Sequence, residues 1–200
     1  MCQLLETIKL VKGKAQNLEY HQRRFDDSRQ RLFNCYERLL LAQHIQPPQG
    51  IAALPRTKCR ILYREKIEKI EYLPYQFPSI RKLRLVFADW IEYPFKYVER
   101  GSLERLYALR QEADDILIVK KGLLTDSSFA NLVFYDGSKY YTPAHPLLAG
   151  TKRQRLLDEG RISPEDIAPQ DLKHFKEVFF INSMLELEDM VGVKSADIIC

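Results

Sequence analysis

Hydrophobic and polar residues alternate along several short segments of the chain, a pattern that predicts β-strands. The first segment, Leu4–Val11, reads LLETIKLV and is followed by a turn at Lys12–Lys14. Apolar and aromatic residues then recur near helical spacing, and Asn17 is a candidate N-cap. These signals predict one long helix from about Leu18 to Gln43, which the Pro-Pro-Gln-Gly run after it ends.

The rest of the first half predicts an antiparallel sheet beside this helix. Three further strands are expected, at Lys58–Tyr63, Ile67–Tyr75 and Ile80–Ala88. A loop containing Pro94 follows, and we place a domain boundary near it. The fold class is therefore α+β, with a small α/β domain at residues 1–92. A larger mixed β domain with flanking helices, at residues 93–200, carries most of the candidate site.

Shorter elements are predicted in the second half. Helices are expected at Ser102–Gln111, at Lys152–Glu159 and from Ser163 onward, and strands at Asp114–Val119, within 122–142 and at Glu177–Asn182. The pair Asp136-Gly137 is a strong signal for a hairpin turn between two strands of the 122–142 segment.

Composition narrows the class of protein. Hydrophobic residues make up 46% of the 200 residues, and the net charge is +4. No basic stripe with interleaved aromatics accompanies this charge, so we expect no nucleic-acid partner. The four cysteines are far apart and form no C-x-x-C pair, so neither a metal site nor a disulfide is expected. Without a signal peptide or a membrane-length apolar run, the sequence predicts a cytoplasmic protein that does not enter a membrane.

The stretch from Gly122 to Arg153 combines several polar features. Asp126 ends a strand-like run, where a buried carboxylate would need a cation or several hydrogen-bond donors. Gly150 precedes a predicted helix, and backbone N–H groups at a helix N-terminus bind anions such as phosphate. The simpler interpretations are that Asp126 forms an ordinary Asx-turn and that Gly150 is only a helix boundary.

Lys96 is a second candidate for chemistry. It lies between aromatic residues, after Tyr93-Pro94-Phe95 and before Tyr97. Removal from water lowers the pKa of a lysine, and a neutral amine can form a Schiff base with a carbonyl group. A surface lysine on a loop is the alternative.

The order of these features resembles the class IV aminotransferases, which are pyridoxal-phosphate enzymes of fold type IV. The family pattern is a G-x-x-T/S-E segment, an Asn five residues after the acid, a D-G hairpin, a T-P pair and a G-I-T-R turn. This chain matches it in order with Gly122–Asp126, Asn131, Asp136-Gly137, Thr142-Pro143 and Gly150–Arg153. In addition, His21, Arg24 and Ser28 resemble the family's H-x-x-R…S helix, and Glu177–Ser183 resembles its last strand. The resemblance covers the chain from about Leu4 to Met190.

The resemblance implies pyridoxal 5′-phosphate as the cofactor and a role for each motif. Lys96 is implied to be the Schiff-base lysine and the general base at the substrate α-carbon. Asp126 stands where the family has a glutamate against the pyridine nitrogen, and is one methylene shorter. The implied phosphate contacts all supply N–H or O–H donors: they are Arg24, the backbone N–H groups of Thr151 and Lys152, and the hydroxyl of Ser183.

Two outcomes of this implied chemistry stay open. Reprotonation at the cofactor gives transamination, of the branched-chain or D-amino acid type. Elimination of pyruvate from an aminodeoxychorismate-like substrate gives 4-aminobenzoate. The run Asn182-Ser183-Met184-Leu185 is closer to the lyase form of the family, which favours elimination, whereas the Ser183 hydroxyl is typical of transaminases.

A substrate carboxylate needs a cationic partner, for which Arg60 and Lys58 are candidates. Both are also compatible with ordinary surface charges on an alternating strand. The resemblance implies a homodimer that acts on a small amino substrate. A relative without cofactor that only binds a partner is the alternative from another class of protein.

Overall fold

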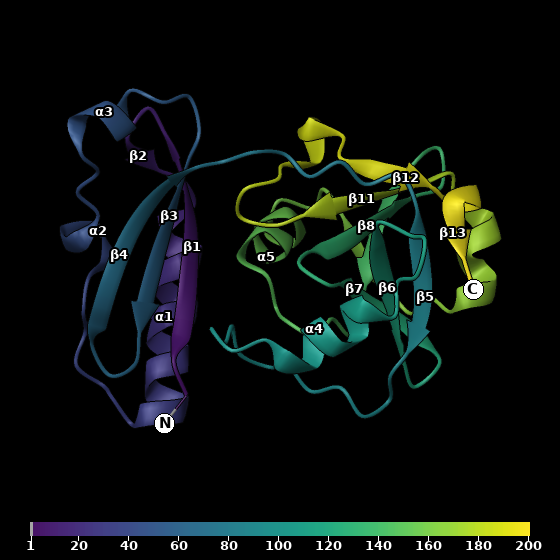
Figure 1. The fold of residues 1–200 in the computed structure, drawn as a ribbon, viewed down its shortest axis with the longest axis horizontal. Helices are drawn as coiled ribbons and strands as arrows, with labels where there is room; N and C mark the ends of the chain where they lie inside the picture. The colour runs from purple at the N-terminus through teal and green to yellow at the C-terminus, as the bar shows by residue number, and fades with distance from the viewer. Residues whose placement is uncertain (1) are drawn as a thin grey trace. The chain divides into compact units, whose positions relative to one another are not determined.

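The computed structural model describes residues 2–200, which form two compact units. The first unit comprises the residues up to Gln76 together with Phe95–Glu99, and the second comprises Phe77–Pro94 and Arg100–Cys200 (Figure 1). The sequence pattern predicts a single domain boundary between residues 92 and 93. In the structure the chain instead enters the second unit, returns to the first for five residues and leaves it again.

The first unit is a four-stranded antiparallel sheet with the helix α1 along it (Figure 1). The strand order is β2-β1-β3-β4. Its elements are β1 (Leu4–Val11), β2 (Lys14–Ala15), α1 (Leu18–Phe33), α2 (Leu41–His44), α3 (Gln49–Ala52), β3 (Thr57–Tyr63) and β4 (Ile67–Pro74). The predicted architecture of an antiparallel sheet beside a helix is confirmed for this unit, but the strand expected at Ile80–Ala88 is not part of it: that segment lies in the second unit, where it pairs in parallel.

The predicted helix is too long, because α1 ends at Phe33 rather than near Gln43. Asn34 adopts a left-handed conformation with φ 56°, and its backbone N–H bonds to carbonyl groups of the last turn of the helix. The chain then turns back, and Leu41 is buried in the core with Phe25 of α1. Apolar residues keep a helical spacing beyond Asn34, but the chain reverses there because Leu41 packs in the core.

The second unit is built on a larger sheet. Its path runs β10-β9-β8-β7-β6-β5-β13, and β11 and β12 are attached to it through β8. Its strands are β5 (Leu83–Phe87), β6 (Asp115–Lys120), β7 (Leu123–Ser127), β8 (Asn131–Tyr135), β9 (Tyr140–Pro143), β10 (Ser163–Glu165), β11 (Glu177–Ile181), β12 (Gly192–Lys194) and β13 (Ile198–Ile199). Its helices are α4 (Gly101–Ala108), α5 (Thr151–Asp158) and three short 3₁₀ turns, η1 (Pro169–His174), η2 (Leu187–Asp189) and η3 (Ser195–Asp197).

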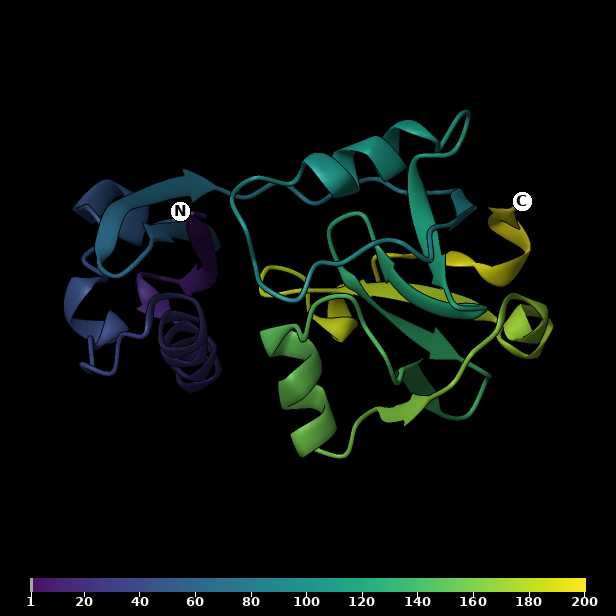
Figure 2. The same cartoon turned by 90° about the horizontal axis from the view of Figure 1, so that it is seen from below.

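Figure 2 shows α4, in teal, and α5, in green, on opposite sides of the central strands of this unit. The segment that begins at Ser163 was predicted to be helical, and that prediction is wrong. It forms β10, which pairs in parallel with β9.

The larger sheet branches at β8. The strand β11 pairs with β8 along its whole length, from Asn131 to Tyr135. The other edge of β8 is shared, because β7 pairs with it at Asn131 and β9 pairs with it at Phe134 and Tyr135. Asp126 and Asn131 therefore lie where β7 and β9 diverge.

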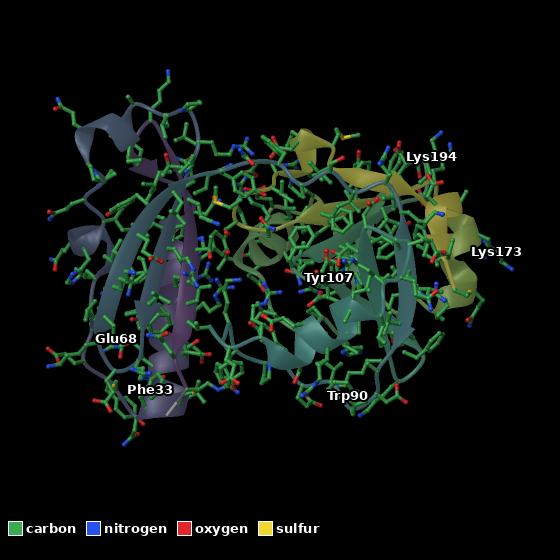
Figure 3. The ribbon with its side chains drawn as sticks, in the orientation of Figure 1. Phe33, Glu68, Trp90, Tyr107, Lys173 and Lys194 are labelled. Carbon is green, nitrogen blue, oxygen red and sulfur yellow. The ribbon has the colours of Figure 1, made fainter. Side chains whose placement is uncertain are left out.

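Side chains fill the space on both faces of the strands (Figure 3). In the second unit, one cluster of buried residues joins β8, β11, α5 and η2: it contains Val133, Leu156, Ile162, Phe179, Ile181 and Leu187. Trp90, labelled in Figure 3, lies at the surface, where the Arg105 guanidinium of α4 stacks over its ring at 5.7 Å. No helix within residues 2–200 is long and apolar enough to cross a membrane.

Candidate active site

A buried acid organises the first unit. The side chains of Leu4, Ile8 and Leu10 face α1 from β1, and Glu6 stands in the middle of this apolar row with no exposed surface. Its carboxylate accepts two hydrogen bonds from Arg24, from Nε at 2.8 Å and from Nη2 at 2.7 Å. A third bond, of 2.6 Å, joins it to His21 Nδ1. Because His21 and Arg24 are three residues apart, both project from the same face of α1.

The charges of this cluster are mutually dependent. Burial alone would raise the pKa of Glu6, but the charge and hydrogen bonds of Arg24, and then of His21, lower it to about 2. An ionised carboxylate only accepts hydrogen bonds, so the proton that faces it is assigned to His21 Nδ1. Burial lowers the pKa of His21, and the charges of Arg24 and Lys96 lower it further, against the opposing effect of Glu6. The cluster is therefore an ionised Glu6–Arg24 pair with a neutral histidine.

Lys96 is attached to the same strand. The backbone N–H of Leu5 donates to the Lys96 carbonyl at 2.9 Å, and Val98 donates to the Gln3 carbonyl at 2.9 Å. An antiparallel bridge between Leu4 and Tyr97 lies between them. The segment 95–99 thus extends the sheet at β1, next to Glu6. The first unit brings together Lys96 and Arg24, two residues that sequence analysis selected separately.

The two predicted substrate residues lie on a different face. On β3, Cys59 and Ile61 point into the core with α1, and Lys58 and Arg60 alternate with them on the other side of the sheet. Arg60 forms a cross-strand ion pair with Glu71 of β4 at 3.0 Å. Their role with substrate stays a prediction.

In the second unit, Asp126 is held by its neighbours at the branch of the sheet. Its Oδ1 accepts a hydrogen bond from Asn131 Nδ2 at 2.8 Å, and its Oδ2 accepts one from the Leu148 backbone N–H at 3.0 Å. Asn131 Nδ2 also donates to the Leu148 carbonyl at 2.9 Å. Strand β8 and the loop before α5 are thereby connected through one amide and one carboxylate.

Burial raises the pKa of Asp126 to about 6. The hydrogen bonds from Asn131 and Leu148 and the charge of Arg153 act in the opposite direction but do not overcome it. A carboxylate offers about four acceptor positions, and the hydrogen bonds from Asn131, Leu148 and Leu147 leave capacity for a further donor. A cationic donor would relieve the cost of burying the charge.

The N-terminus of α5 is close to this acid. Gly150 is its N-cap, and a Cβ atom at Gly150 would overlap the amide oxygen of Asn131. A side chain larger than hydrogen is therefore excluded there. Arg153, in the first turn, donates from Nη2 to the Pro143 carbonyl at 2.8 Å, and its buried Nε has no acceptor within residues 2–200.

Ser183 lies in a turn that follows β11. The turn is shaped by Asn182, whose Oδ1 accepts the backbone N–H groups of Met184 at 2.8 Å and Leu185 at 3.0 Å. Asn182 therefore stabilises this turn. From the sequence it was recognised only as part of a family motif. Ser183 itself is partly exposed, as is Asn182, whereas Met184 is buried.

Glu6 and Glu186 were not selected as site residues from the sequence. A signal for Glu6 was present, because it is the one acid in the apolar row of β1. Glu186, which forms an ion pair with Lys152, had no such signal. Its partner is 34 residues away in the chain, and no local pattern connects them.

Solved structures share this fold. A protein from Haemophilus somnus 129pt, described as a "putative 4-amino-4-deoxychorismate lyase", matches with a TM-score of 0.84 and 32% identity, over 92% of this chain and 97% of that chain. A "putative amino-acid aminotransferase" from Mesorhizobium loti matches with a TM-score of 0.76 and 22% identity, over 100% of both chains. The fold and its polar motifs define the class: this is the architecture of the fold type IV pyridoxal-phosphate enzymes.

Residues 3–195 match the sequence profile of the family described as "Amino-transferase class IV", and the chain belongs to this family. A Haemophilus influenzae protein described only as uncharacterized is 36% identical over 192 residues, which are 92% of this chain and 98% of that protein. A "putative aminodeoxychorismate lyase" from Schizosaccharomyces pombe is 31% identical over 93 residues, 44% of this chain and 39% of that protein. The chain is thus a member of a family of enzymes that use pyridoxal phosphate.

The polar groups in each unit fit this cofactor. A pyridine nitrogen that keeps its proton needs a buried acceptor, and Asp126 provides a carboxylate with unused capacity. A phosphate group needs N–H donors, and the N-terminus of α5 in the second unit presents them. Arg24, in the first unit, donates to Glu6, and its contact with a phosphate stays a prediction.

Proposed function

We propose that this protein is a pyridoxal-phosphate-dependent lyase that forms 4-aminobenzoate and pyruvate from an aminodeoxychorismate-like substrate, which would place it in folate biosynthesis. The observation that carries the proposal is the 32% identity, across nearly the whole chain, with the Haemophilus somnus protein described as a putative lyase of this kind. The turn Asn182–Leu185, which resembles the lyase form of the family, supports it further.

The proposal assigns a task to each polar group. Asp126 would hold the proton on the pyridine nitrogen, since a buried carboxylate favours a cationic partner. Arg24 and Ser183, with the backbone N–H groups of Thr151 and Lys152, would bind the phosphate. When bound, the cofactor withdraws electrons from the substrate carbon that carries the amino group.

Lys96 would be the residue that binds the cofactor covalently and afterwards moves the proton. Its amino group would take the proton from the amino-bearing ring carbon of the substrate. The enolpyruvyl group then leaves with the electron pair of its carbon–oxygen bond. The remaining ring becomes aromatic, and the enolpyruvate takes up a proton to become pyruvate.

The covalent role of Lys96 is tested with the purified full-length chain and pyridoxal phosphate. We expect a visible absorption band, and borohydride should then fix the cofactor to a single peptide that contains Lys96. Lys96→Ala should remove the band, whereas Lys173→Ala, a change at an exposed lysine of η1, should keep it (Figure 3). A colourless wild-type protein would contradict the cofactor assignment, and a different labelled peptide would contradict the choice of Lys96.

The reaction is tested by supplying aminodeoxychorismate and measuring pyruvate and 4-aminobenzoate together. Release of both in equal amounts supports the lyase. Transamination is the second candidate, because Ser183 keeps the hydroxyl that is typical of the transaminases. Transfer of an amino group from an amino acid to 2-oxoglutarate, without pyruvate release from aminodeoxychorismate, would replace the lyase by this alternative.

The homodimer implied by the family resemblance stays a prediction, which light scattering of the purified protein can check.

A further inference from the structure

Two separate segments of the second unit carry its proposed phosphate contacts. One is the first turn of α5, with the backbone N–H groups of Thr151 and Lys152. The other is the turn after β11, with the hydroxyl of Ser183. A cradle made from two segments needs something that fixes them relative to each other, because a phosphate is bound well only by donors that are already in place.

An ion pair joins these two segments. The ammonium group of Lys152 contacts the Glu186 carboxylate, and Arg155 Nη1 lies 3.9 Å from the same carboxylate. The Lys152 side chain has no exposed surface, and that of Glu186 is 17% exposed. Leu156 of α5 and Leu187 of η2 also pack in one buried cluster, which joins the same two segments.

The position of Lys152 is unusual for a lysine. A cation in the first turn of a helix opposes the macrodipole, so the helix itself gains nothing from it. A fully buried ammonium is also unfavourable unless a counter-ion faces it. Glu186 supplies such a counter-ion for Lys152. The chain also departs here from the family's G-I-T-R turn, since it reads Gly150-Thr151-Lys152-Arg153.

The turn that contributes Glu186 is itself ordered. The Glu186 backbone N–H donates to Asp189 Oδ2 at 2.8 Å, and Asn182 closes the preceding turn around Ser183. A constraint applied at Glu186 is therefore transmitted to Ser183 through a short, hydrogen-bonded segment. The ion pair connects this segment to the first turn of α5.

We propose that Glu186 is a positioning residue, which holds Lys152 and so keeps the N-terminus of α5 and the Ser183 turn in one cradle for the cofactor phosphate. This inference rests on the proposed cofactor site. It concerns the phosphate, because the ion pair joins the two segments assigned to the phosphate and does not include Asp126, the acid assigned to the ring nitrogen.

The test uses two ligands that differ only in the phosphate: pyridoxamine 5′-phosphate and pyridoxamine. Neither has an aldehyde, so no covalent bond to a lysine contributes to their affinity. Dissociation constants are measured by fluorescence for the full-length wild-type chain and for Glu186→Gln. We expect the substitution to weaken binding of pyridoxamine 5′-phosphate about tenfold, a change of the size seen when a supporting residue around a bound group is removed. Binding of pyridoxamine should be unchanged.

The matched control is Glu188→Gln. Glu188 lies two residues further along and pairs with Arg161 at 2.5 Å, but it is 60% exposed and does not contact α5 in this pair. It should change neither constant. If Glu186→Gln fails to fold, Glu186→Asp, which keeps the charge, is measured in its place and should show a smaller loss that is again confined to the phosphate ligand.

The outcomes separate the inference from the proposed function. If the wild-type chain binds neither pyridoxamine 5′-phosphate nor pyridoxal phosphate, the cofactor site itself is wrong. If it binds them and the variant loses affinity equally for both pyridoxamine ligands, Glu186 is only a structural residue and the inference is overturned. It is also overturned if affinity for the phosphate ligand stays the same or rises, as it would if Glu186 merely screened the ammonium charge.

Discussion

Asn131 and Asp126 face each other across β8 and β7, and the Asn131 amide donates to Asp126 Oδ1 at 2.8 Å. The same amide occupies the space beside Gly150, where any side chain would overlap it. One asparagine thus aligns the acid assigned to the cofactor ring and also sets how closely the start of α5 can approach. Changes at any of these three positions should therefore affect the others.

Gly150→Ala should destabilise the second unit. The new methyl group would collide with the Asn131 amide and force it away from Asp126, and overpacking of this kind costs about 1–3 kcal/mol. The free energy of unfolding from urea denaturation gives the measurement. Gly101→Ala is the matched control, because Gly101 also begins a helix of this unit but has open space around its Cα. Equal effects of the two substitutions would contradict the proposed contact.

The pH dependence of stability should reveal Asp126. Burial raises the pKa of Asp126 from its ordinary value of 3.8 to about 6, so the folded state binds the proton more tightly than the unfolded state. Between pH 4 and 6 the free energy of unfolding should therefore fall as the pH rises, by about 3 kcal/mol from this group alone.

The Asp126→Asn variant has no carboxyl group at this position. Its free energy of unfolding should therefore lack this dependence on pH, whatever its value at a single pH. Asp197→Asn, at an exposed position, should retain it. Urea denaturation at several pH values between 4 and 7 provides the comparison. An unchanged slope in Asp126→Asn would show that the acid is not buried as described.

Glu6→Gln should weaken the first unit at neutral pH and flatten its acid sensitivity. The pKa of Glu6 is about 2 in the folded chain against an ordinary value of 4.5, so its contribution to stability is complete above pH 4.5 and is lost as the pH falls toward 2. Loss of one partner from a buried ion pair costs about 3–5 kcal/mol, because Arg24 keeps its charge.

Denaturation at pH 7 and at pH 3 measures both effects of Glu6→Gln. Glu68→Gln changes an acid on β4 that pairs with Arg64 at the surface, and should leave the stability at pH 7 almost unchanged. If Glu6→Gln is as stable as the wild type at pH 7, the ionised pair contributes nothing and the description of the cluster is wrong.

Arg60→Gln tests the predicted contact with a substrate carboxylate. If Arg60 binds this group equally in the ground state and the transition state, KM should rise about tenfold while kcat is retained. Lys69→Gln is the control, because Lys69 pairs with the same Glu71 at 2.8 Å but is 61% exposed. If KM is unchanged in Arg60→Gln, Arg60 does not bind the substrate carboxylate and only forms a surface ion pair.

Much of the fold could be predicted from local patterns. The alternation LLETIKLV matches β1 residue for residue, since one face of this strand is buried against α1. The Asp-Gly turn and the glycine before α5 were also visible, because turns and helix starts need particular backbone conformations. The end of α1 could not be predicted in this way, because apolar residues keep a helical spacing past Asn34 while the chain reverses to bury Leu41.

The sequence by itself determined the family motifs, the α+β class and the residues with suitable chemistry, because each depends on residue types at short spacing. Only the tertiary structure decided which of these residues meet. The pairing of Glu6 with Arg24, the attachment of Lys96 to β1 and the contact between Lys152 and Glu186 join positions far apart in the chain. The packing of strands and helices determines such contacts, and the same packing buries Asp126 and raises its pKa.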